Sequence, residues 1–153
     1  MDIENIRKAA TDFRNATEIC APSLDITFKS FPRGSCGEAV LLLGTYLIEQ
    51  GLGEFQYMLG KYGICKDSDW SYHAWLQSDS LVVDITAYQY PEITEKVIVQ
   101  DVSKWHTKLN GTAQQVADYR ICPAYAVSLL DSMYRKITAT IKKQAQQITN
   151  GST

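Results

Sequence analysis

The segment from Glu38 to Glu49 constrains this chain most strongly, because it predicts a helix that is apolar on nearly every face. A helix of that kind is stable only where other elements cover it on all sides. Gly51 and Gly53 follow it and supply a stop signal at its C-terminal end. We therefore expect a central, buried helix with the rest of the chain folded around it. Its apolar residues are Ala39, Val40, Leu42, Leu43, Tyr46 and Leu47.

The segments on either side of this helix predict an α+β domain. Apolar residues recur at helical spacing over residues 2–19 and 123–147, and alternation over residues 24–28 predicts an extended piece. Four runs rich in β-branched and aromatic residues, which predict antiparallel strands, occupy the middle of the chain. We expect residues 1–147 to form one domain and residues 148–153 to be a frayed polar tail. The four predicted strands are 55–59, 73–77, 81–86 and 97–99.

The composition fits a globular domain and excludes several classes of protein. The chain has 153 residues, of which 45% are hydrophobic and 21% charged, enough to bury a core without a metal or disulfide. The net charge is −2 and the chain has no basic stripe, so it does not resemble a nucleic-acid binder. The longest near-apolar run, residues 39–48, is shorter than the roughly 20 residues of a membrane span. The N-terminus lacks the features of a signal peptide, so we expect a cytoplasmic protein, or one exported without a classical signal.

Four cysteines stand at positions 20, 36, 65 and 122, and no two of them form a Cys-x-x-Cys pair. That spacing does not support a zinc site, and no cofactor or metal is expected. In a reducing compartment all four are expected to be free thiols. We interpret Cys20, Cys65 and Cys122 as small structural residues. Cys36 differs from them in its surroundings.

Cys36 stands at the predicted start of the central helix. Unpaired backbone N–H groups and the helix dipole favour a thiolate at that position. Gly34 and Gly37 leave the sulfur open to a substrate and allow a tight turn into the helix. The backbone N–H of Cys36 would point toward the oxyanion that forms when the sulfur attacks a carbonyl. Cys36 is therefore the predicted nucleophile.

The base is predicted to be His73 and the acid Asp84, on two strands of one hairpin. A two-residue loop at Ser78-Asp79 would place His73 directly opposite Asp84, with Cβ atoms about 5 Å apart on one face of the sheet. Asp84 could then fix one imidazole nitrogen and leave the other for the thiol. The second histidine, His106, has no acid in a comparable register and receives no role.

Three sequence blocks in this order resemble the Cys–His–Asp core of the transglutaminase-like branch of the papain-like superfamily. The resemblance covers residues 30–90 and implies a papain-like fold in which the nucleophile begins the central helix. It implies a hydrolase or transferase that acts on an amide or acyl carbon of a protein or peptide, as a glutamine deamidase, a thiol protease or a transglutaminase does. The blocks are Gly34-Ser35-Cys36-Gly37, His73-Ala74-Trp75-Leu76 and Val83-Asp84-Ile85-Thr86.

Two alternatives and one missing group accompany this hypothesis. The turn Arg33-Gly34 before Cys36 also resembles that of arylamine N-acetyltransferases, although those enzymes are much longer. A catalytically inactive papain-like fold, used as a binding module or immunity partner, belongs to a different class of function. No Gln lies between residues 1 and 48 to serve as a papain-type oxyanion donor. The candidates for that donor or for the cleft wall are Ser30, Ser35, Gln89, Trp75 and Tyr88.

Overall fold

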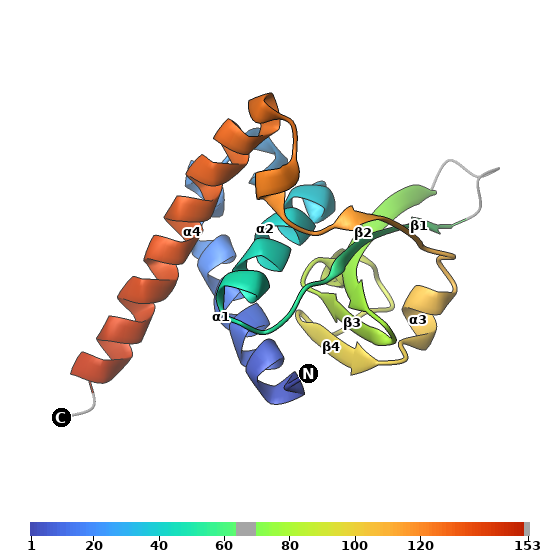
Figure 1. Cartoon of the computed structure of the whole chain (residues 1–153), viewed down its shortest axis with the longest axis horizontal. Coiled ribbons are helices and arrows are strands. Elements are labelled where there is room, and N and C mark those ends of the chain that lie inside the picture. Colours follow the sequence, from blue (N-terminus) through green and yellow to red (C-terminus); the bar gives the residue numbers. More distant parts are fainter. Residues whose placement is uncertain (64–69, 152–153) are drawn as a thin grey trace.

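The computed structural model describes residues 1–63 and 70–151 and has an α+β architecture (Figure 1). Its five strands form one antiparallel sheet in the order β4-β3-β2-β1-β5. The strands are β1 (Gln56–Tyr62), β2 (Ser71–Ser78), β3 (Leu81–Asp84), β4 (Ile98–Asp101) and β5 (Thr112–Val116). The helices are α1 (Ile3–Cys20), α2 (Cys36–Glu49), α3 (Lys104–Thr107) and α4 (Ala124–Asn150). None of the helices in the described part of the chain is long and apolar enough to cross a membrane.

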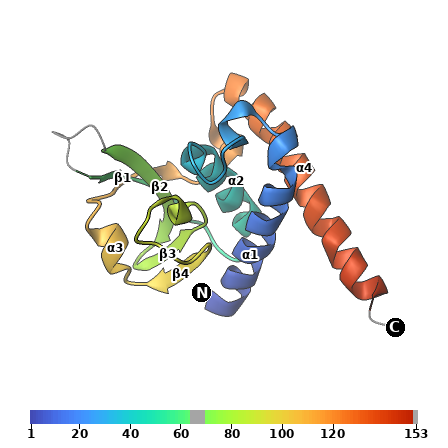
Figure 2. The ribbon, with the colours of Figure 1, turned by 180° about the vertical axis from the view of Figure 1, so that it is seen from behind.

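Helix α2 is the buried central helix that the sequence predicts. It packs against β2 on one side and against α1 and α4 on the other. Figures 1 and 2 show these three helices grouped on the same side of the sheet in both views. The side chains of Leu42, Leu43 and Leu47 are at most 1% exposed. Because three elements cover it, α2 can be apolar on nearly every face.

The two faces of the sheet pack against different partners. Ala74, Leu76 and Val83 join the large core that the helices cover. On the other face Trp75 and Val82 form a smaller cluster, which holds the segment containing α3. Successive residues of a strand point to opposite faces, so His73 and Asp84 belong to the same face as this smaller cluster.

Trp75 fits between two glycines. A Cβ atom at Gly60, on β1, would come within 2.8 Å of the Trp75 ring, and one at Gly111 within 2.4 Å. Real side chains do not approach so closely, so any larger residue at either position would displace the ring. The indole therefore fixes the spacing between β1, β2 and the chain that follows α3.

Two predicted elements differ from the structure, and one strand was not predicted. Residues 24–28 do not form a strand: Ile26–Phe28 is a turn of 3₁₀ helix, closed by the bond from Phe28 N to Asp25 O. An extended segment needs a neighbouring strand to satisfy its backbone, and 24–28 pairs with none of the described strands. The sequence analysis missed β5, an edge strand that pairs only with β1 and has mostly exposed side chains. Helix α4 continues to Asn150, so the first residues of the predicted frayed tail are helical.

The predicted hairpin register is also wrong. The predicted turn at Ser78-Asp79 would place Ala74 opposite Val83. The turn lies instead at Asp79-Ser80, and Leu76 is the residue opposite Val83. Asp79 takes a φ of 51°, a left-handed conformation that Asp adopts more readily than most residues. Moving the turn by one residue shifts every opposed pair by two, which keeps each side chain on its face. His73 and Asp84 are thus diagonal neighbours on the same face, within reach of a ring side chain.

Candidate functional site

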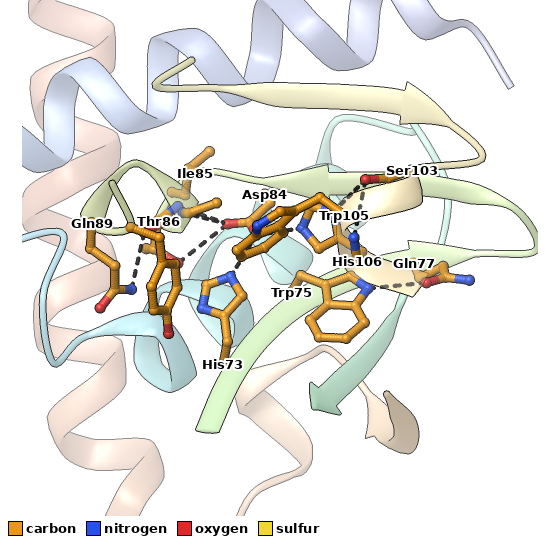
Figure 3. A network of polar contacts seen from close by, with 12 residues as sticks. His73, Trp75, Gln77, Asp84, Ile85, Thr86, Gln89, Ser103, Trp105 and His106 are labelled. Atoms are coloured by element: carbon orange, nitrogen blue, oxygen red, sulfur yellow. Dashed lines mark hydrogen bonds and ion pairs between the residues drawn. The ribbon is translucent and has the colours of Figure 1, made fainter. Parts of the chain in front are cut away.

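Asp84 lies at the end of β3, where the chain turns sharply. Its Oδ1 accepts hydrogen bonds from the backbone N–H of Thr86 at 2.8 Å and of Ala87 at 3.0 Å, and from the Thr86 hydroxyl at 3.3 Å. These donors belong to the turn that begins after the strand, so the backbone itself holds the carboxylate. Its second oxygen, Oδ2, remains for the two histidines (Figure 3).

His73 donates to Asp84 as the sequence predicts. Nε2 of His73 lies 2.6 Å from Oδ2 of Asp84, and neither side chain is more than 1% exposed. The other ring nitrogen, Nδ1, is buried and has no hydrogen-bond partner in the described part of the chain. A buried polar atom without a partner is uncommon and points to a functional role.

His106 binds the same carboxylate oxygen, which the sequence analysis did not predict. Its Nε2 lies 2.8 Å from Oδ2 of Asp84, and its Nδ1 lies 2.6 Å from the hydroxyl oxygen of Ser103. The register of the hairpin could reveal only an acid that pairs with a histidine of the hairpin itself. His106 comes from α3, outside the hairpin, so its contact with Asp84 was not predicted. The one available signal was Ser103, three residues before His106, which caps α3.

The electrostatics of the site favour an ionised pair. Burial opposes charge on Asp84, but His73 and the bond from His106 outweigh it and hold the pKa of Asp84 well below its usual range. Burial also opposes charge on His73, and the Asp84 carboxylate again outweighs it. With a smaller contribution from Cys36, the pKa of His73 rises to about 9. The imidazole is therefore prepared to hold a second proton.

Cys36 is the first residue of α2, as expected, and its side chain is half-buried. Gly34, two residues before it, takes a φ of +76°, which glycine adopts without strain. The Ser35 hydroxyl donates to the Pro32 carbonyl at 3.2 Å and does not cap the helix. The thiol is near enough to His73 to raise the pKa of the ring, although it makes no hydrogen bond of standard geometry to Nδ1.

Tyr57 is a second group that the sequence analysis missed. Its hydroxyl lies 3.0 Å from the place that a Cβ atom of Gly37 would occupy, beside the first turn of α2. Burial, and after it the nearby Cys36, raises the pKa of Tyr57 to about 12. The phenol therefore keeps its proton at neutral pH and can donate a hydrogen bond near the Cys36 sulfur.

Aromatic rings enclose His73. Trp75 stacks beside the ring at 6.1 Å between centroids, and Tyr90 and Trp105 meet it edge-on at 5.2 and 5.7 Å. Trp75 was a candidate for the oxyanion donor or for the cleft wall. Its side chain is 2% exposed, so it can support His73 as part of the wall but cannot donate to a substrate. Its N–H donates to Gln77 at 3.0 Å.

The other predicted donors are occupied or distant from the site. Ser30 is exposed in the loop before Pro32, and its carbonyl accepts from Arg33. The amide of Gln89 donates to the Thr86 carbonyl at 3.0 Å. Tyr88 is 43% exposed and lies 5.8 Å from the Lys96 amino group. Each of these groups thus has another partner or faces solvent.

The remaining cysteines lie in different surroundings from Cys36. Cys20 is buried, with its sulfur 3.0 Å from the Thr140 hydroxyl. Cys122 is half-buried and accepts from the Gln115 amide at 3.7 Å. Cys20 is the last residue of α1, and Cys122 lies two residues before the first residue of α4. Cys65 lies outside the described residues.

His73, Asp84 and His106 also have the residue types of a metal site, with three possible ligand atoms within 4.8 Å of one another. Two ligands about 2.0–2.1 Å from a tetrahedral metal ion would stand about 3.3 Å apart. The nitrogen–oxygen distances of 2.6 and 2.8 Å are shorter than this and are those of N–H···O hydrogen bonds.

Comparison of the chain with protein-family models, with curated proteins and with solved structures gave no match.

Proposed function

We propose that the protein is a cysteine-dependent hydrolase or transferase that acts on an amide or acyl carbon of a protein or peptide. The single observation that carries this proposal is the state of His73. One ring nitrogen is bound to the buried Asp84. The other is buried and has no hydrogen-bond partner of standard geometry among the described residues, and the nearby Cys36 thiol helps to raise the pKa of the ring. Cys36 is then the nucleophile, His73 the base and Asp84 the group that orients it.

The reaction divides into two steps. Nδ1 of His73 takes the thiol proton, and the Cys36 sulfur attacks the substrate carbonyl carbon. The tetrahedral intermediate collapses as Nδ1–H returns the proton to the leaving nitrogen, which departs as ammonia or an amine and leaves a thioester. Water or an acceptor amine, deprotonated by the same nitrogen, then attacks the thioester and releases the product and the free thiol.

The developing oxyanion needs hydrogen-bond donors near the sulfur. The N–H groups of the first turn of α2 have no carbonyl partner within the helix, and the Ser35 side chain does not cap them. The protonated Tyr57 hydroxyl lies beside the same turn. We assign the oxyanion to these groups, in place of the donors predicted from the sequence.

The substrate carbonyl approaches the site from the side of the half-buried Cys36 sulfur. His73 and Asp84 are buried, so no substrate atom contacts the carboxylate. A flexible side chain such as glutamine, or an extended peptide, can bring a carbonyl to the half-buried sulfur. Glutamine deamidation of a protein and cleavage of a peptide are therefore the favoured reactions, on a core that resembles the papain-like fold.

Alkylation with iodoacetamide over a pH series, followed by peptide mapping, tests the proposal. Cys36 should react fastest of the four cysteines, most clearly at the acidic end of the series, since the helix terminus and the His73 imidazolium favour its thiolate. The other three cysteines serve as internal references. Equal rates at all four positions would refute the nucleophile and leave a papain-like binding module as the better hypothesis.

A further inference from the structure

The two histidines share one oxygen of Asp84. Both Nε2 atoms lie within hydrogen-bond distance of Oδ2, at 2.6 Å for His73 and 2.8 Å for His106. An ionised carboxylate can only accept hydrogen bonds, so each Nε2 must carry a proton and donate it. Asp84 thereby fixes the tautomer of both rings at once.

The rings differ at their other nitrogen. Nδ1 of His106 is bonded to the Ser103 hydroxyl at 2.6 Å, whereas Nδ1 of His73 has no hydrogen-bond partner of standard geometry in residues 1–63 and 70–151. Ser103 is itself buried and caps the helix that carries His106. With both nitrogens occupied, His106 cannot exchange a proton with a substrate and can act only through Asp84.

The structure holds His106 in place from several sides. Trp75 meets its ring edge-on at 5.1 Å, and Trp105 meets it at 4.8 Å. The N–H of Trp105 donates to Glu92 at 3.0 Å, which ties α3 to the loop after Tyr90. A ring that is 2% exposed and fixed in this way can keep its bond to Oδ2 throughout a reaction.

From this geometry we propose that His106, supported by Ser103, is a positioning residue that shares the charge of Asp84 with His73. The proposal rests on the proposed function, since the reaction at Cys36 gives the chain of hydrogen bonds its purpose. The relay then runs from Ser103 through His106, Asp84 and His73 to Cys36.

Sharing the oxygen has a definite electrostatic consequence. A second donor on Oδ2 draws negative charge away from His73, whether His106 is neutral or protonated. The three donors on Oδ1 keep Asp84 in place without His106. Loss of His106 should therefore raise the pKa of His73. The ionisable groups that face His73 are Cys36 from α2, Asp84 from β3, His106 from α3 and Tyr90 from the loop after β3.

NMR titration of the histidine ring protons measures this effect directly. The chain has two histidines, so His73 is the only one left in a His106 variant. His106→Phe keeps a ring but removes both nitrogens, and it should raise the pKa of His73 by about 0.5–1 unit. His106→Gln can still donate an amide N–H to Oδ2 and should shift it much less. Ser103→Ala, which leaves the ring intact, should give a smaller rise than His106→Phe and provides the test should His106→Phe not fold.

Thr107→Val is the matched control. It removes the bond from the Thr107 hydroxyl to the Ser103 carbonyl within α3 but contacts neither Asp84 nor the His106 ring through that bond. Its His73 titration should match that of the wild type. An unchanged His73 titration in folded His106→Phe and Ser103→Ala, or an equal shift in Thr107→Val, would overturn the proposal.

The test is independent of any substrate. Alkylation of Cys36 in the wild type decides the proposed function, whereas the titration decides whether His106 acts on His73. An unreactive Cys36 together with a shifted His73 would refute the function and keep the coupling. A reactive Cys36 with an unchanged pKa of His73 in the variants would keep the proposed function and refute the coupling.

Discussion

The two histidines bound to Asp84 make the same contact with its carboxylate and differ in what surrounds their other ring nitrogen, Nδ1. On each side a buried histidine donates Nε2–H to the same oxygen. On the His73 side the second nitrogen has no hydrogen-bond partner among the residues that the structure describes, and a half-buried thiol lies nearby. On the His106 side the second nitrogen is bonded to the Ser103 hydroxyl. A histidine with one ring nitrogen free of hydrogen bonds can transfer a proton through it. A histidine with both ring nitrogens hydrogen-bonded can only position the groups that it is bonded to.

The two histidines also come from different parts of the fold. His73 comes from β2, in the middle of the sheet, and is connected through Cys36 to the start of α2. His106 comes from a short helix seated on the sheet by Trp75 and Leu109. The reactive side thus depends on the central helix, and the supporting side on a small separate cluster. This difference leads us to expect unequal effects from equivalent substitutions.

The largest effect should come from His73→Gln compared with His106→Gln. Without the imidazolium the Cys36 thiolate loses the positive charge beside it, so its alkylation in weakly acidic buffer should slow by about 10²–10³-fold. His106→Gln should leave that rate close to the wild-type value, since Asp84 still accepts from His73 and orients it. Rates from quenched samples of both variants give the comparison. Similar losses in both would remove the distinction between the two histidines.

The pH dependence of stability should come next in size. The folded state raises the pKa of His73 from about 6.5 to about 9, so this group's contribution is fully present below pH 6.5. It is lost as the pH rises through about 9, which should lower the free energy of unfolding by about 3 kcal/mol.

Urea unfolding between these two pH values, with His73→Gln as reference, measures the loss. The variant has no imidazole at this position and should show a flatter profile in that window. The lowered pKa of Asp84 acts in the opposite direction along the pH axis: its contribution is present above about pH 4 and is lost only in strong acid. Parallel profiles for wild type and variant would contradict the raised pKa.

The smallest effect should be that of Cys36→Ala on stability. The thiol is half-buried and makes no hydrogen bond to His73 of standard geometry, so its loss should cost under about 1 kcal/mol. Leu43→Ala, in the same helix but fully within the core, should cost about 2–5 kcal/mol. Thermal unfolding of the two variants compares them. Equal losses would assign Cys36 to the core and not to a reaction.

The sequence predicted what depends on local pattern. The buried central helix, Cys36 at its start, and His73 and Asp84 on one face of a hairpin all follow from periodicity within a single element or pair. The register error did no harm to the last of these, because a shift of two residues preserves the face.

What escaped prediction depends on contacts between distant segments. His106 reaches Asp84 only because Trp75 seats the segment around α3 on the sheet, and no spacing along the chain encodes that. Tyr57, on β1, approaches Gly37 in the first turn of α2, a contact that no local pattern encodes either. The strand β5 has polar side chains because it lies at an exposed edge, so it lacks the alternation that would reveal it.

The fit of Trp75 between Gly60 and Gly111 has a consequence for any survey that scores every substitution by its effect on cells. Alanine at either glycine would overlap the indole. The displaced indole would move α3, and His106 with it. Such a survey would rank two residues without functional groups beside Cys36 and His73, and sensitivity alone would not separate them. Only a variant that keeps the fold and loses the proposed reaction, as we expect of Cys36→Ala, would identify the chemistry.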